Sequence, residues 1–152
     1  MFKRILVVCV GNICRSPTAE FLLRERLQQS NVPHSDVQVA SAGLSAMVGH
    51  PMEAIAAQVM RDHGVDGSSH RARQLTPAMV RDSDLVLVME QSHLAAIGRM
   101  APPTSGKVFL LGKWQGDTRI SDPYRHERGE FDHVYQLIEQ GVASWLPHIQ
   151  VP

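Results

Sequence analysis

The sequence lacks the features that place a protein outside the cell or across a membrane. Two cysteines in 152 residues are too few for the disulfide framework of a small secreted domain. No apolar run approaches the length of a transmembrane helix, and the N-terminus has no apolar signal-peptide core. We therefore expect a cytoplasmic protein without membrane insertion.

An excess of charge of either sign is also missing. Lys and Arg number 15, as do Asp and Glu, so no overall field favours nucleic acid or a membrane surface as a partner. The eight histidines are scattered without zinc-like spacing, and the two cysteines have no matching pair. We expect no metal and no cofactor, and we take most of the histidines to be surface residues.

What the sequence does contain is an alternation of strand and helix patterns. This alternation predicts an α/β fold in which helices cover both faces of a parallel sheet. We find no linker, so residues 1–152 are expected to form one domain, with a loop at 101–106. Strands are expected at 3–9, 37–41, 84–89 and 107–111, and helices at 17–29, 51–62, 77–81, 91–100 and 127–145.

The segment that starts with Cys9 comes directly after the apolar run 5–8, and Arg15 follows six positions later. Ser16 and Pro17 are typical of an N-cap and a first helical residue, so a helix is expected to begin here. A thiol attacks phosphorus usefully only as the thiolate. A free cysteine has a pKa of about 8.5, whereas a cysteine at a helix N-terminus can have one of about 3.5–7.5. The placement therefore suits a cysteine nucleophile.

The residues around Cys9 suit the binding of a phosphate group. Arg15 offers a planar fork for bidentate phosphate contact, which a lysine cannot copy. Gly11 permits the unusual backbone angles of a tight anion loop, and Asn12 tolerates left-handed geometry. The Ser16 hydroxyl is also placed to donate to the thiolate. The alternative is a buried structural cysteine, since most free cysteines are buried and inert.

A displacement at phosphorus needs an acid for the leaving oxygen. Asp122 is the best candidate, because it precedes Pro123 in a polar, turn-rich stretch. The proline biases Asp122 toward an extended conformation, which suits a carboxylate held over a pocket. The alternative is an ordinary Asp-Pro turn.

The segment 8–17, Ser41-Ala42-Gly43 and Asp122-Pro123-Tyr124 together resemble the low-molecular-weight protein-tyrosine-phosphatases. The resemblance covers essentially the whole chain. It implies a flavodoxin-like fold with four parallel strands in the order 2-1-3-4. The stretches 41–44, 70–74 and 84–90 and the surroundings of Lys107 resemble the bacterial branch that regulates exopolysaccharide and capsule production. The partner in that branch is a tyrosine autokinase of the inner membrane.

The resemblance also implies roles for individual residues. Cys9 would form a phosphocysteine intermediate, Arg15 would bind phosphate and stabilise the transition state, and Asp122 would act as acid and then as base. The phosphate loop and its supports would be Val10, Gly11, Asn12, Ile13, Cys14, Ser16 and Ser41. The slot for the phenyl ring of a phosphotyrosine would be walled by Ile13, Leu44 and Tyr124.

Three features stay open at the level of the sequence. Cys9 and Cys14 are close enough to form a reversible protective disulfide, and the alternative is that Cys14 only packs. Arg71 and Arg73 are candidates for attracting an anionic tail or for bracing a loop. Trp114 is expected to pack under the loop before Asp122 or to help dock a partner.

Rival functions are weaker. Arsenate reduction on this fold needs further cysteines downstream, and none follows Cys14. A non-catalytic phosphotyrosine-binding module would be expected to lose the nucleophile or the acid. A thiol oxidoreductase would be expected to carry Cys-x-x-Cys, which Cys9 and Cys14 do not form.

Overall fold

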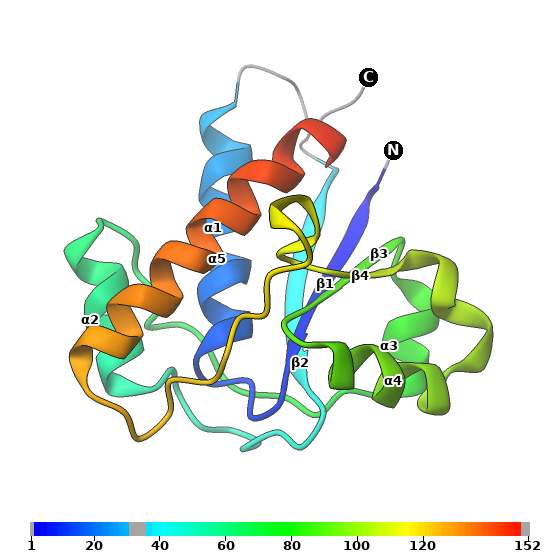
Figure 1. Cartoon of the computed structure of the whole chain (residues 1–152), viewed down its shortest axis with the longest axis horizontal. Coiled ribbons are helices and arrows are strands. Elements are labelled where there is room, and N and C mark those ends of the chain that lie inside the picture. The colour runs from blue at the N-terminus through cyan, green and yellow to red at the C-terminus, as the bar shows by residue number, and fades with distance from the viewer. Residues whose placement is uncertain (1, 31–35, 150–152) are drawn as a thin grey trace.

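Four parallel strands form one sheet in the order β2-β1-β3-β4 (Figure 1). The strands are β1 (Arg4–Cys9), β2 (Gln38–Gly43), β3 (Leu85–Val88) and β4 (Val108–Leu110). The computed structural model describes residues 2–30 and 36–149. The predicted α/β class and the predicted strand order are confirmed.

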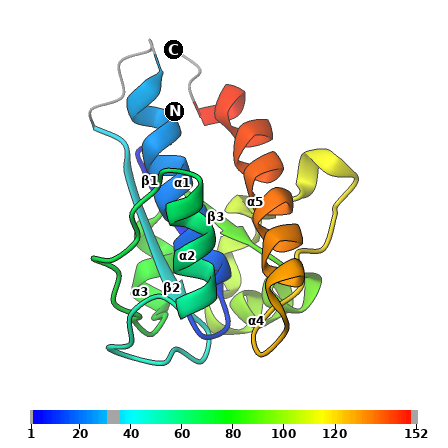
Figure 2. The ribbon, with the colours of Figure 1, turned by 90° about the vertical axis from the view of Figure 1, so that its left-hand side faces the viewer.

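The pleat of the strands divides the apolar side chains between two cores. In β1, Ile5 and Val7 join the core on one face of the sheet, while Leu6 and Val8 join the core on the other. Successive side chains of a strand point to opposite faces. The first face is covered by α1 (Arg15–Gln29), α2 (Ala54–Asp62) and α5 (Arg128–Ile149), and the second by α3 (Pro77–Asp82) and α4 (Gln91–Met100) (Figures 1 and 2).

The carboxyl ends of the strands place the chemistry-bearing residues at one edge of the sheet. β1 ends at Cys9 and leads through residues 10–14 into α1. β3 is followed closely by Glu90 at the start of α4, and β4 leads toward Asp122. Ligands of open parallel sheets bind beyond this edge, so the fold itself brings these three residues together.

Helix α1 begins two residues earlier than the sequence suggests. Cys14 is the N-cap and Ser16 lies inside the first turn, so the prediction that Ser16 caps the helix is wrong. The Ser16 hydroxyl instead contacts the thiol of Cys9. Pro17 is tolerated in the first turn, because the N–H groups there have no partner within the helix.

Other boundaries differ for local reasons. α2 starts at Ala54, after the predicted Pro51, because the Glu53 side chain accepts a hydrogen bond from Ala56 N and caps the helix. Thr76 caps α3 as predicted. The expected loop at 101–106 contains a short 3₁₀ helix, η1 (Pro102–Lys107). A second 3₁₀ helix is η2 (Lys113–Gln115).

The last helix, α5, continues past its predicted end at Trp145. Trp145 and Ile149 are both buried and lie one turn apart, so the apolar stripe of the helix extends to its last turn. Among the helices of the described ranges, none combines the length and the hydropathy needed to cross a bilayer.

Candidate active site

The loop between β1 and α1 turns its carbonyl groups outward. The carbonyls of residues 9–13 each accept a hydrogen bond from a donor outside the loop. In chain order, the donors are the amides of Leu44, Ser45 and Met47, Nε2 of His70 and the amide of Glu53. The N–H of a trans peptide unit points opposite to its C=O. The amides of residues 10–14 therefore face away from these donors and form a cradle for an anion.

Cys9 lies at the end of β1 and receives two hydrogen bonds from Ser16. Its Sγ is 2.9 Å from Ser16 Oγ and 3.4 Å from Ser16 N. Ser16 Oγ also accepts a hydrogen bond from Asn12 Nδ2 at 2.8 Å, which leaves the hydroxyl proton free to donate to sulfur. Hydrogen bonds donated to a charged form favour that form. The site is thus built to hold a thiolate.

Asn12 is the residue that fixes the shape of the loop. It is fully buried and has a left-handed backbone with φ 59°. Its Nδ2 donates to Ser41 Oγ at 3.0 Å and its Oδ1 accepts from Arg73 N at 2.9 Å. Ser41 in turn donates to the Glu20 carboxylate at 2.6 Å. Each polar atom of the Asn12 side chain therefore has a partner, which keeps the strained loop in one conformation.

Gly11 does not have the role expected of it. Its φ is not in the left-handed region, and an added Cβ would make only ordinary contacts, 3.8 Å from Ile13 at the nearest. The left-handed position belongs to Asn12. The glycine that the loop needs is Gly43 in β2, where a Cβ would lie 2.4 Å from the carbonyl oxygen of Val10.

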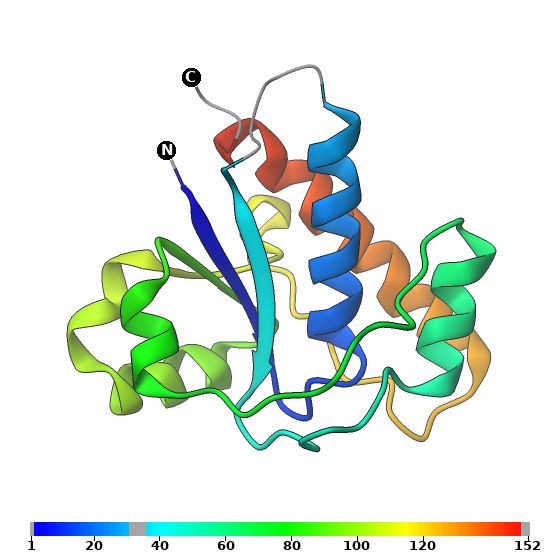
Figure 3. The same cartoon turned by 180° about the vertical axis from the view of Figure 1, so that it is seen from behind.

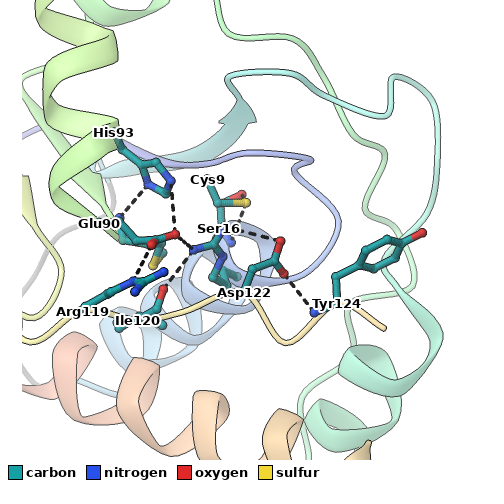
Figure 4. Close-up of polar contacts among 10 residues, drawn as sticks. Cys9, Ser16, Glu90, His93, Arg119, Ile120, Asp122 and Tyr124 are labelled. Atoms are coloured by element: carbon teal, nitrogen blue, oxygen red, sulfur yellow. Dashed lines mark hydrogen bonds and ion pairs between the residues drawn. The ribbon is translucent and has the colours of Figure 1, made fainter. Parts of the chain in front are cut away.

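Arg15 is buried, with 2% of its surface exposed. Its Nη1 donates to Glu90 Oε2 at 2.6 Å and to the carbonyl of Ile120 at 2.9 Å (Figure 4). These two acceptors use both protons of Nη1. The Nε and Nη2 edge of the guanidinium stays available, and this is the edge that can form a bidentate contact with phosphate.

Glu90 holds Arg15 from the end of β3 and is charged at neutral pH. Burial would raise the pKa of the Glu90 carboxyl, but hydrogen bonds from Arg15 and Arg119 more than offset this and lower it. His93 lies beside it, with Nε2 3.6 Å from Glu90 Oε2. Burial and the charge of Arg15 lower the pKa of His93, which keeps the imidazole neutral next to the phosphate site.

A cavity of about 200 Å³ opens above Cys9 and collects the predicted catalytic residues. Asp122 lines it with Oδ2 3.7 Å from Arg15 Nη2, while its Oδ1 accepts a hydrogen bond from Tyr124 N at 3.0 Å (Figure 4). The Asp122 side chain is 46% exposed, so it can reach a bound molecule. The cavity therefore brings a thiol, a guanidinium group and a carboxyl group together in one place.

The walls of this cavity are largely apolar. Ile13 and Tyr124 lie in the lining as predicted. Leu44 does not, because its side chain packs against the core that also contains Leu6 and Val8. Ser45 and Met47 line the cavity instead. An aromatic ring on the phosphate would thus meet an isoleucine, a methionine and a tyrosine.

The sequence matches a known protein family over almost its whole length. The family model described as low molecular weight phosphotyrosine protein phosphatase matches residues 4–151. The chain belongs to this family. Its members are hydrolases of phosphate esters, and the cavity described above has the geometry for that chemistry.

Individual relatives are similar over almost their full length. The protein-tyrosine-phosphatase Etp of Escherichia coli K12 is 45% identical over 97% of this chain and 95% of its own length. Wzb of Salmonella typhimurium LT2 is 46% identical over 95% of this chain and 93% of its own. The structure of Vibrio vulnificus Wzb in complex with benzylphosphonate superposes with a TM-score of 0.90. It is 41% identical and covers 97% of this chain and 99% of that one.

The second cysteine of the phosphatase is buried beside the first. Burial raises the pKa of the Cys14 thiol well above its ordinary value, and the charge of Cys9 raises it further. Cys14 therefore stays protonated at neutral pH. A disulfide between the two remains a prediction.

Several residues of the phosphatase site escaped the sequence analysis. Glu90, Glu20, His70 and His93 all hold catalytic-loop residues or their partners, and the two histidines are buried rather than on the surface. Within residues 2–30 and 36–149, no three or more His, Cys, Asp or Glu side chains gather as metal ligands would.

The structure also shows the contacts of Arg71, Arg73 and Trp114, whose roles the sequence leaves undecided. Arg73 braces the loop, through its backbone N–H to Asn12 and its Nε to the carbonyl of Ser41 at 2.9 Å. Arg71 donates to the carbonyls of Ser68 and His70. Trp114 stacks on His148 of α5 with 4.0 Å between ring centroids, so it packs the loop against the last helix.

Proposed function

We propose that this phosphatase hydrolyses phosphotyrosine in proteins through a phosphocysteine intermediate. The observation that carries the proposal is the joint presence of Cys9, Arg15 and Asp122 in the lining of one cavity, above a ring of backbone amides. Each of the three supplies a part of a two-step displacement at phosphorus.

In the first step the Cys9 thiolate attacks phosphorus and the bond to the tyrosine oxygen breaks. The sulfur electron pair forms the S–P bond, and the electrons of the P–O bond leave with the oxygen. Asp122 gives its proton to that oxygen, so tyrosine departs as the neutral phenol. The Nε–Nη2 edge of Arg15 and the loop amides hold the three remaining phosphate oxygens as charge shifts onto them.

In the second step a water molecule attacks phosphorus and the S–P bond breaks. Asp122, now a carboxylate, takes a proton from this water, and the sulfur leaves as a thiolate. The Ser16 hydroxyl and amide stabilise the leaving sulfur, as they do the attacking one. The enzyme returns to its starting state with inorganic phosphate in the loop.

The walls of the cavity favour an aromatic phosphate ester. Ile13, Met47 and Tyr124 offer apolar contact to a phenyl ring that stands above the phosphate. A phosphoserine has a shorter side chain and no ring, so it would bring its own backbone against these walls before its phosphorus reached Cys9. We therefore assign phosphotyrosine as the substrate class.

The substrate protein that fits best is a bacterial tyrosine autokinase of the inner membrane that controls exopolysaccharide or capsule production. The support is the resemblance of the stretches 41–44, 70–74 and 84–90 to the branch of the family with that role. The similarity to Etp and Wzb over almost the whole chain agrees with it. On this proposal the phosphatase works in the cytoplasm, where the kinase domain of such a partner lies.

The test compares three substrates at equal concentration: a phosphotyrosyl peptide, the same peptide with phosphoserine, and an autophosphorylated autokinase domain. We expect release of phosphate from the first and third, with at most traces from the second. Arg15→Lys should lose most of the activity, because lysine lacks the planar guanidinium that contacts phosphate with two donors. Cys9→Ser should lose all of it. Phosphotyrosine binding without turnover in the wild type would point to a binding module instead.

A further inference from the structure

A second cavity lies behind the phosphate loop. It has a volume of about 270 Å³ and is bounded by α1, the middle of β2 and the segment 69–73. Figure 3 shows that segment in green, crossing the N-terminal part of α1 on the way to α3. Its charged and polar lining comprises Glu20, Arg24, Ser41, Ser69, His70, Arg71 and Arg73.

The cavity has an excess of positive charge. Three guanidinium groups line it, against one carboxylate. That carboxylate, on Glu20, is already satisfied, because Ser41 Oγ donates to Oε1 and Arg24 Nη2 donates to Oε2, each at 2.6 Å. The charges of Arg71 and Arg73 have no carboxylate partner among the residues that the structure describes.

Backbone carbonyls hold these two arginines in place without using their full donor capacity. Arg73 donates from Nε to the carbonyl of Ser41 at 2.9 Å. Arg71 donates from Nη1 to the carbonyl of His70 at 2.6 Å. The other side-chain nitrogens find no acceptor in the described part of the chain: these are Nη1 and Nη2 of Arg73, and Nε and Nη2 of Arg71. Both arginines are exposed to solvent, and their remaining N–H groups can donate to an oxyanion that enters the cavity.

We propose that this cavity is a second binding site, selective for a phosphate group and distinct from the loop above Cys9. The phosphate group would come from inorganic phosphate or from a phosphate monoester. The volume of about 270 Å³ leaves room for an organic group on the phosphate.

The second site is joined to the catalytic loop by direct hydrogen bonds. The backbone N–H of Arg73 donates to Asn12 Oδ1 at 2.9 Å, and Nε2 of His70 donates to the Asn12 carbonyl at 2.6 Å. A phosphate bound by Arg73 therefore acts on the residue that positions Ser16 and, through it, Cys9. Coupling of this kind is reciprocal, so occupancy of each site changes the affinity of the other.

The test is an NMR titration of the wild-type protein that follows the arginine Nε–Hε signals. Inorganic phosphate is added in one series and glycerol 2-phosphate in the other. We expect the signal of Arg15 and the signals of Arg71 and Arg73 to saturate at different ligand concentrations. Tighter binding of the monoester at Arg71 and Arg73 would identify an organic phosphate as the preferred ligand. Equal binding would mean that the site recognises the phosphate group alone.

Variants separate the two sites. Arg71→Gln should weaken the second binding event by about tenfold or more, since a charge-assisted hydrogen bond is lost. Arg71→Lys, which keeps the charge, should weaken it less. Arg99→Gln, at an exposed position on α4, is the matched control and should change neither event. The proposal is overturned if the Arg71 and Arg73 signals follow the Arg15 curve, shift without saturation, or respond equally in wild type and Arg71→Gln.

Discussion

The buried guanidinium of Arg15 is held by the carboxylate of Glu90, with 2.6 Å between Nη1 and Oε2. This contact decides how the phosphate-binding edge of Arg15 is oriented, because it occupies the opposite side of the guanidinium. Arg119 holds the other oxygen of Glu90 and thereby ties the loop before Asp122 to the same carboxylate. Arg15, Glu90 and the loop that carries Asp122 are therefore linked by hydrogen bonds through the Glu90 carboxylate.

Glu90→Gln should lower kcat/KM for aryl phosphates by about 10- to 100-fold, since misplacement of a catalytic group by a fraction of an ångström to an ångström costs this much. The glutamine keeps the size of the side chain but removes its charge. Glu127→Gln, an exposed carboxylate before α5, is the control. Wild-type kinetics in Glu90→Gln would show that Arg15 does not need this partner.

Glu90→Gln should also change how the free energy of unfolding depends on pH. Because the pKa of Glu90 is lowered in the folded protein, its carboxylate binds a proton more readily in the unfolded chain than in the folded protein. The contribution of Glu90 to stability is therefore present above about 4.5, its ordinary pKa, and is lost as the pH falls through the lower folded value. Urea unfolding of wild type and Glu90→Gln at a series of acidic pH values should show that the difference between their free energies of unfolding shrinks as the pH falls. A difference that stays constant with pH would contradict this.

Asp122→Asn should slow esters with poor leaving groups more than those with good ones. A leaving phenol of high pKa needs the proton from Asp122, whereas p-nitrophenol departs readily without it. We expect losses of about 10²- to 10⁴-fold for unactivated aryl phosphates, the range for general acid catalysis. The measurement is kcat/KM across substituted aryl phosphates. Equal losses across the series would remove Asp122 from the acid role.

Mild peroxide should convert Cys9 and Cys14 into a disulfide and protect Cys9 from over-oxidation. Both thiols line the catalytic cavity, and the sulfenic acid that peroxide forms on Cys9 can condense with the other thiol to a disulfide. Mass spectrometry of non-reduced digests should find the bridge, and a thiol reductant should restore activity. Stable sulfinate on Cys9 without a bridge would count against protection, and Cys14→Ala should then behave like the wild type.

Much of the fold was predictable because its signals are local. The apolar run Leu85–Val88 is followed by a polar start of helix, and Thr76 precedes a proline, so strand and cap could be assigned without tertiary information. The loop from Cys9 to Arg15 was predictable for the same reason. Its function depends on spacing within one short segment.

Ser16 shows where local rules fail. Ser-Pro is a typical helix start, yet the Ser16 hydroxyl serves Cys9 and the helix begins at Arg15. Cys14 takes the N-cap position, so Ser16 lies in the first turn with its hydroxyl next to Cys9, and only the folded loop reveals this. Leu44 was misplaced for a similar reason, because the sequence does not state which side of its loop faces the core.

The supports of the site were the least predictable part. Glu90 lies 75 positions from Arg15 and His70 lies 58 positions from Asn12, so no spacing within a motif links them. A signal for Glu90 was nevertheless present, since a charged residue just after a buried parallel strand lies at the edge where ligands bind. For His70 the sequence carried no comparable physical signal.

The central claim is that Cys9 carries the phosphate during turnover. The measurement that tests it most directly is rapid acid quenching of the wild type with p-nitrophenyl phosphate, followed by mass spectrometry of the peptide that contains Cys9. The mechanism predicts phosphate on Cys9 within the first turnover, in the presence of EDTA, and none in Cys9→Ser. Release of p-nitrophenol by a folded, reduced enzyme with no phosphate on Cys9, or turnover that survives in Cys9→Ser, would contradict it.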